Sequence, residues 1–173
     1  MRTFYSHRKL AEDVYIEIAG LEYEDFAVGQ IFEHRPGRTF TAEDNRLHAL
    51  RAADLSARSV DAVFNEKVYG GDQVISETLV LGVVTALTTK TFNKVVANLG
   101  WRQVRFPTPV RVGDTIYAES EVLGKRDSES RPTQGILHIR TRAVNQRGEE
   151  VCSFERHLLI YKRGLGPYDA AGY

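Results

Sequence analysis

Apolar residues near the middle of the chain recur with the period of a helix. The segment from residue 75 to residue 87 has an apolar residue at every fourth position and further apolar residues beside them: Ile75, Leu79, Val80, Val83, Val84 and Leu87. This spacing predicts a helix with an apolar side wide enough to be buried. The β-branched valines lower the helix propensity of the segment, but we take the spacing as the stronger signal.

The second half of the chain has the pattern of long strands. Four segments rich in Val, Ile, Thr and Tyr follow one another: 95–106, 115–126, 135–146 and 151–162. In the third segment apolar residues alternate with His138, Arg140 and Arg142, which is the two-residue period of a half-buried strand. Residues 145–149 read NQRGE and predict a hairpin turn in which Gly148 adopts a positive φ.

The first half contains shorter elements. Tyr23–Phe40 predicts a turn, a short strand after Gly29, a second turn at Pro36-Gly37 and the start of another strand. Thr41 is a favourable helix N-cap, and Ala42–Arg58 contains neither Gly nor Pro, so we predict a helix there. Helices followed by long antiparallel strands predict an α+β domain in which one buried helix is wrapped by four or five strands.

Composition narrows the class of protein. The chain has 173 residues, 42% of them apolar, which suits one compact domain. Basic and acidic residues number 23 each, so the electrostatic footprint of a nucleic-acid or polybasic membrane protein is missing. The apolar stretch 74–87 is too short and too interrupted to span a bilayer, and residues 1–20 lack the apolar core of a signal peptide. Together with a single cysteine, Cys152, these features predict a cytoplasmic protein with no membrane or nucleic-acid partner.

Three segments carry a family resemblance. Tyr23–Thr41 reads YEDFAVGQIFEHRPGRTFT, and Val104–Val122 reads VRFPTPVRVGDTIYAESEV, an Arg-Phe-Pro strand followed by a Gly-Asp turn. Ser130–Arg156 reads SRPTQGILHIRTRAVNQRGEEVCSFER. Together they resemble the MaoC-like dehydratase family, and the third resembles its mesaconyl-CoA or methylmalyl-CoA hydratase branch. The resemblance covers roughly residues 21–163, with residues 1–20 as an N-terminal extension and 164–173 as a tail.

The resemblance implies a hot-dog fold, in which a long antiparallel sheet wraps around a central helix, here Ile75–Thr91. It implies a carbon–oxygen lyase that adds water to, or removes it from, an enoyl thioester of a short branched or dicarboxylic acyl-CoA. The acyl-CoA would lie where two hot-dog units meet, so the expected partner is a second copy or another hot-dog chain. No metal or redox cofactor is implied, because CoA is part of the substrate.

The family motif Asp-x-Asn-Pro-x-His can be placed in two registers. The first puts it on Asp54–Ser59, which reads DLSARS, so that Asp54 keeps the acid and Ser59 replaces the histidine. The second puts it on Glu43–His48, which reads EDNRLH and supplies His48, but it removes the helix that precedes the motif. We prefer the first register because it fits on both sides. His48 then belongs to the preceding helix, and Ser59 is a loop serine with no histidine near it in sequence to activate it.

The start of the central helix also departs from the family, which has Ala-His-Gly where this chain has Ile75-Ser76-Glu77. Ser76 is expected to cap the helix, and a backbone N–H near Ser76 and Glu77 is expected to bind the thioester oxygen. Glu77 is either a replacement acid–base group or a helix-start carboxylate, and an acid there would also suit a hot-dog thioesterase. Because two family residues have changed, we expect slow catalysis or a non-catalytic subunit that pairs with an active MaoC-like chain.

Candidate substrate contacts lie on the later strands and loops. Arg105 and Arg131 are expected to contact CoA phosphates through charge-assisted hydrogen bonds. Asn98 is expected to line an acyl tunnel. Five scattered histidines without an acidic cluster at ligand spacing do not indicate a zinc site.

Overall fold

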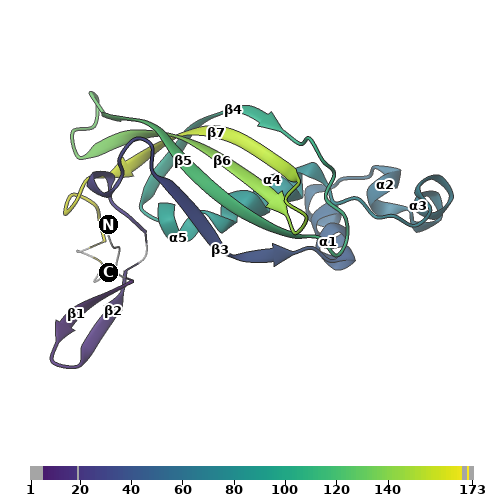
Figure 1. Cartoon of the computed structure of the whole chain (residues 1–173), viewed down its shortest axis with the longest axis horizontal. Coiled ribbons are helices and arrows are strands. Elements are labelled where there is room, and N and C mark those ends of the chain that lie inside the picture. The colour runs from purple at the N-terminus through teal and green to yellow at the C-terminus, as the bar shows by residue number, and fades with distance from the viewer. Residues whose placement is uncertain (1–5, 19, 169–170, 172–173) are drawn as a thin grey trace.

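The computed structural model describes residues 6–18, 20–168 and 171, and its main feature is a curled antiparallel sheet along one helix (Figure 1). The sheet has five strands in the order β3-β5-β6-β7-β4. Its members and the helix are β3 (Ile31–Thr39), β4 (Val95–Arg105), β5 (Thr115–Asp127), β6 (Gln134–Asn145), β7 (Glu150–Tyr161) and α4 (Glu77–Leu87). The predicted α+β architecture, with long antiparallel strands around one helix, is confirmed.

The other elements lie at the two ends of this body (Figure 1). They are the hairpin β1 (His7–Ala11) and β2 (Val14–Glu17), the 3-10 turn η1 (Tyr23–Asp25), and the helices α1 (Ala42–Ala52), α2 (Ala57–Val60), α3 (Ala62–Tyr69) and α5 (Thr89–Phe92). We call α2 and α3 together the α2–α3 lobe. It projects from one end of the sheet, and the β1–β2 hairpin projects near the other end.

The four long strands lie within one residue of their predicted bounds. On β6 the inward side chains of Leu137, Ile139 and Ala143 are fully buried, and the alternate Arg140 and Arg142 face outward. The turn before β7 also forms as predicted, with Gly148 at φ 80° donating its N–H to the carbonyl of Asn145 at 3.0 Å. Strict alternation fixes which face of a strand is buried, and this explains why the pattern was sufficient here.

The central helix packs one side against the concave face of the sheet. Val80 and Val84 are buried in a cluster with Phe40, Ile116 and Phe154 from the surrounding elements. The predicted helix is therefore confirmed, although residues after Thr88 form the separate turn α5. On the opposite side Gly82 and Ala86 are exposed, so the chain leaves one apolar stripe of α4 uncovered.

The predicted turn at Pro36-Gly37 is wrong, because β3 continues through it. The pairing of β3 with β5 shifts register between His34 and Arg38, which accommodates a proline that has no N–H to donate. Gly37 is required there for space, since a Cβ at this position would lie 2.6 Å from the ring of Tyr117. A bulged edge strand has the same residue signals as a turn, so the sequence pattern did not separate them.

The helix predicted over Ala42–Arg58 is also too long. It begins as expected with a capping box between Thr41 and Asp44, but α1 ends at Ala52, and Ala53 adopts the left-handed conformation with φ 52°. The chain then forms α2 and α3, which the sequence analysis did not predict. The side chain of Asp61 caps α3 by accepting the backbone N–H of Phe64 at 2.9 Å.

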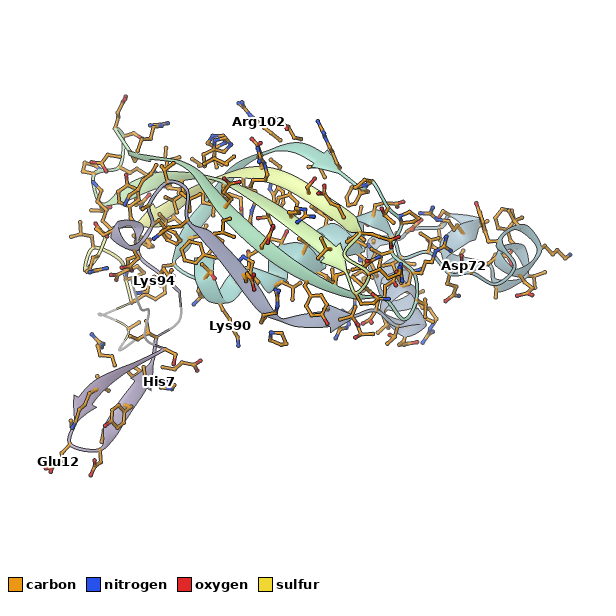
Figure 2. The ribbon with its side chains drawn as sticks, in the orientation of Figure 1. His7, Glu12, Asp72, Lys90, Lys94 and Arg102 are labelled. Carbon is orange, nitrogen blue, oxygen red and sulfur yellow. The ribbon has the colours of Figure 1, made fainter. Side chains whose placement is uncertain are left out.

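Asp72, labelled in Figure 2, lies where the α2–α3 lobe rejoins the body and pairs with Arg111.

Within residues 6–18, 20–168 and 171, no helix has the length and apolar character needed to cross a membrane.

Cys152 is fully buried, and burial raises the pKa of its thiol to about 12. The residue therefore behaves as a small apolar core residue.

A buried polar network links the sheet to the chain after α4. The imidazole of His34 shares a hydrogen bond with the hydroxyl of Ser120 at 2.9 Å, and Ser120 with that of Thr141 at 2.9 Å. The guanidinium of Arg156 is only 3% exposed and donates to the hydroxyl of Thr88 at 3.1 Å. Burial, with the charges of Arg156 and then Arg35, lowers the pKa of His34 to about 4. His34 therefore stays neutral at neutral pH.

This network predicts a specific loss of stability in acid. The pKa of His34 in the folded protein lies below its ordinary value of 6.5. The contribution of neutral His34 to the free energy of unfolding is therefore complete above pH 6.5 and is lost as the pH falls toward 4. Between pH 7 and pH 4.5 the wild type should lose about 2 kcal/mol more free energy of unfolding than His34→Gln, measured by urea denaturation. His7→Gln, in the exposed hairpin, is the control. Equal pH slopes for the wild type and His34→Gln would contradict the assignment.

Candidate functional site

The candidate site is assembled around the first turn of α4 by contacts from α1. The amide of Asn45 accepts the backbone N–H of Ser76 at 2.9 Å and donates to the carbonyl of Val74 at 3.4 Å. Ser76 occupies the N-cap position, but its hydroxyl pairs with that of Thr78 at 2.9 Å and makes no capping hydrogen bond. The predicted side-chain cap is therefore wrong, because the neighbouring hydroxyl engages Ser76 instead.

His48 reaches the same turn from α1. Its Nε2 lies 2.8 Å from the hydroxyl of Thr78, and the side chain is half-buried. Asn45 and His48 are three residues apart on one face of α1, so the bond that fixes Asn45 also directs the imidazole toward α4. The imidazole of His48 therefore lies at the first turn of α4.

The carboxylate of Asp54 accepts two hydrogen bonds, from Ser56 just before α2 and from Ser59 within α2. Its Oδ1 accepts the backbone N–H of Ser56 at 3.0 Å, and its Oδ2 accepts the hydroxyl of Ser59 at 2.9 Å, while the Ser56 hydroxyl donates to Ser59 at 3.0 Å. The backbone bond from Ser56, then the two hydroxyls, lower the pKa of Asp54, and the charge of His48 lowers it further. Asp54 is therefore ionised at neutral pH and lies within electrostatic reach of His48.

Glu77 is paired with the guanidinium of Arg58, which lies in α2. Both of its carboxylate oxygens lie 3.0–3.1 Å from Nη2 of Arg58. The negative charge beside the helix start is therefore balanced, which lessens its repulsion of a developing oxyanion. A carboxylate held in this pair is poorly suited to act as the single acid or base that the thioesterase alternative requires.

A cavity of about 440 Å³ lies between α1 and the α2–α3 lobe. Its wall combines apolar and polar side chains, namely Ala42, Glu43, Asn45, Arg46, Leu50, Arg58, Ser59, Val60, Asp61, Ala62, Asn65 and Gln73. Ser59 lines the cavity and also donates a hydrogen bond to Asp54, so the cavity adjoins the Asp54 carboxylate. In the part of the chain that the structure describes, no three His, Cys, Asp or Glu side chains are grouped as metal ligands.

The predicted substrate contacts lie in different places. Arg105 is exposed at the end of β4, next to Phe106, which packs against the α4 cluster. Asn98 accepts a hydrogen bond from Arg156 near the C-terminal end of α4, and Arg131 lies in the loop between β5 and β6 at that same end. The structure thus brings Asp54, Ser59, His48, Ser76 and Glu77 together and leaves Asn98 and Arg131 apart from them.

Sequence analysis considered Asn45 only as the asparagine of the less favoured motif register, and it gave Arg58, an intervening position of the preferred register, no role of its own. Each acts through a contact with a residue about 20 to 30 positions later in the chain. An asparagine in a helix interior is unfavourable unless its amide has a tertiary partner.

The sequence model of the protein family named MaoC like domain matches residues 25–142. The chain belongs to this family. It is 33% identical over 147 residues to mesaconyl-CoA hydratase of Cereibacter sphaeroides, covering 84% of this chain and 42% of that protein. It is 30% identical over 142 residues to β-methylmalyl-CoA dehydratase of Chloroflexus aurantiacus, covering 82% of this chain and 40% of that protein.

A solved structure has the same fold. A Mycobacterium tuberculosis protein described as having a double hot-dog fold superposes with a TM-score of 0.78 and 25% identity, over 86% of this chain and 46% of that one. The hot-dog expectation is therefore confirmed for this MaoC-like chain. The chain spans less than half the length of these relatives.

The hydroxyl of Ser59 should keep the Asp54 carboxyl acidic. In Ser59→Ala the pKa of Asp54 should rise toward its ordinary value, because one hydrogen bond to the ionised form is lost. The measurement is a pH titration of the Asp54 carboxyl carbon by NMR. Ser130→Ala, in an exposed loop, is the control, and an unchanged Asp54 titration in Ser59→Ala would contradict the geometry.

Proposed function

We propose that this chain hydrates or dehydrates an acyl-CoA thioester at the first turn of α4. The observation that carries the proposal is the contact of the His48 imidazole with Thr78 in the first turn of α4, next to a loop whose Asp54 carboxylate feels the charge of His48. A helix start offers unpaired N–H groups and a favourable dipole for negative charge. Family membership supports the same reaction class.

The thioester oxygen would bind at the first turn of α4. The N–H of Val80 donates to the carbonyl of Ser76 at 3.0 Å, so the N–H groups of Glu77 and Thr78 precede the first intrahelical donor. In hydration, water attacks C3 of the enoyl thioester and negative charge develops on the thioester oxygen before C2 is protonated. Backbone N–H groups placed at that oxygen stabilise the charge as it forms.

The proton transfers would be divided between two side chains. Asp54 has a lowered pKa, so it is a weak base that orients the attacking water and stabilises positive charge. His48, which contacts the first turn of α4, would be the second proton-transfer group. Ser59 stands where the family has its histidine, and its hydroxyl already donates to Asp54. We therefore propose that His48, from α1, partly replaces the missing histidine and that the enzyme is slow.

The proposed substrates are short branched or dicarboxylic acyl-CoAs. The support is similarity to two relatives, one named mesaconyl-CoA hydratase and the other β-methylmalyl-CoA dehydratase. Both names denote branched four-carbon-chain dicarboxylic acyl groups.

Steady-state assays with mesaconyl-CoA and crotonyl-CoA, following the enoyl thioester absorbance, test the roles. Asp54→Asn and His48→Gln should each reduce kcat by roughly 10²- to 10⁴-fold, the usual cost of losing an acid–base partner. Ser59→Ala should stay within about tenfold of the wild type, because the backbone N–H of Ser56 still donates to the Asp54 carboxylate.

Two results would contradict this assignment. A kcat of His48→Gln equal to that of the wild type would exclude a proton-transfer role for His48. A wild type without turnover on either thioester would instead support the second candidate, a non-catalytic subunit that pairs with an active MaoC-like chain. The replacement of the family histidine by Ser59 is the observation that favours this candidate.

We also propose that the chain pairs with a second hot-dog unit, in the simplest case a second copy. The exposed stripe of α4 at Gly82 and Ala86 needs an apolar cover, because the helix is apolar on nearly all sides. In the described chain β4 forms the end of the sheet, and Leu99, Trp101 and Val104 on it are more than a third exposed. An open edge strand with apolar side chains is a template for pairing.

A charge placed on the exposed stripe should separate the pair. Ala86→Arg should convert a dimer to a monomer in sedimentation velocity, because it buries an unpaired cation in the interface. Ser130→Arg adds the same charge to an exposed loop and should leave the dimer intact. A wild-type monomer at all concentrations, or a dimeric Ala86→Arg, would contradict the pairing surface.

A further inference from the structure

The α2–α3 lobe has few contacts with the rest of the protein, from which it projects (Figure 1). Of the described side chains, none in α2 or α3 belongs to either buried apolar cluster of the body. Among the described residues, the hydrogen bonds and ion pairs of the lobe stay within residues 54–72, with one exception. The exception is the ion pair between Arg58 in α2 and Glu77 in the first turn of α4.

The lobe is bounded at both ends by left-handed backbone conformations. Ala53, before the lobe, has φ 52°, and Gly70 and Gly71, after it, have φ 62° and 77°. The chain beyond these glycines returns to the body, where Asp72 pairs with Arg111. The ion pair of Arg58 with Glu77 therefore joins two segments that the backbone connects only through these bends.

The donors that orient the Asp54 carboxylate lie on the lobe side of the first bend. The backbone N–H of Ser56 comes just before α2, and the hydroxyl of Ser59 lies within α2. A displacement of α2 would therefore carry both donors, and the carboxylate with them, away from α4. Arg58 stands between Ser56 and Ser59 in the sequence, so its contact with Glu77 acts at the same point of the chain.

We propose that Arg58 and Glu77 form a positioning pair, which holds α2 against the first turn of α4 and thereby directs the Asp54 carboxylate toward that turn. The catalytic part of this inference rests on the proposed hydratase function, whereas the contact between α2 and α4 does not. Glu77 then acts through Arg58 and transfers no proton itself.

The pair is accessible to solvent. Nη2 of Arg58 lies 3.0–3.1 Å from both carboxylate oxygens of Glu77, and the two side chains are 35% and 48% exposed. Ion pairs with this exposure are weak and are screened by salt. The contact therefore biases the position of the lobe and does not lock it.

Amide hydrogen exchange tests the contact without an assay of turnover. In Arg58→Met and in Glu77→Ala the amides of α3 should exchange about three- to fivefold faster, the shift that one exposed ion pair gives to an opening equilibrium. A short helix released from the body is marginal in water, so opening of the lobe exposes its amides. Arg142→Met breaks a comparably exposed pair on β6 and should leave α3 unchanged. Unchanged exchange of α3 in Arg58→Met and Glu77→Ala would overturn the proposal.

Two further measurements separate this contact from independent effects of the two residues. The double variant should exchange no faster than either single variant, because the same contact is lost in all three. Raising the ionic strength from about 0.01 M to about 1 M should speed α3 exchange in the wild type but not in the variants. Additive effects in the double variant, or an equal salt response in all proteins, would contradict the pair.

Turnover of mesaconyl-CoA distinguishes positioning from the other roles open to Glu77. Positioning predicts that Arg58→Met and Glu77→Ala each lower kcat about three- to fivefold. An acid–base role predicts a loss of roughly 10²- to 10⁴-fold in Glu77→Ala alone. Repulsion of the oxyanion predicts a gain in Glu77→Ala and a loss in Arg58→Met. Either of the last two patterns would overturn the positioning role. A wild type without turnover would remove the hydratase function, whereas hydrogen exchange would still decide whether the pair holds α2.

Discussion

The site depends on the two hydrogen bonds made by the amide of Asn45. This side chain is 4% exposed and ties α1 to the residues on either side of Ile75, just before α4 begins. The position of His48, one turn further along α1, and the loop that carries Asp54 both follow from this tie. The sheet fixes α4 by apolar packing, whereas Asn45 fixes α1 relative to the start of α4.

The strands were predictable and the site was only partly so, for one physical reason. The alternation along β6 is a local property, since each side chain is buried or exposed according to its own position in the strand. The groups that define the site meet over long separations, as His48 does with Thr78 and Arg58 with Glu77. Family resemblance put Asp54 and Ser59 on one loop, but the structure places Ser59 in the short helix α2, which begins after the left-handed Ala53 ends α1.

Most carboxylates of the site are paired with an arginine. Glu77 is matched by Arg58, and Glu43 by Arg46. The Asp54 carboxylate has hydrogen-bond donors and the nearby imidazole in place of a paired cation. Of these three carboxylates, Asp54 is therefore the one whose charge is not matched by a guanidinium.

The α2–α3 lobe is joined to the body through α1 and a short return past Asp72, and it begins and ends with its own signals, Asp61 at the start of α3 and the left-handed Gly70 at its end. Mutations in this lobe therefore change a pocket wall with little effect on the packing of the β-sheet. The wall of the cavity and the packing of the sheet can therefore vary independently of each other.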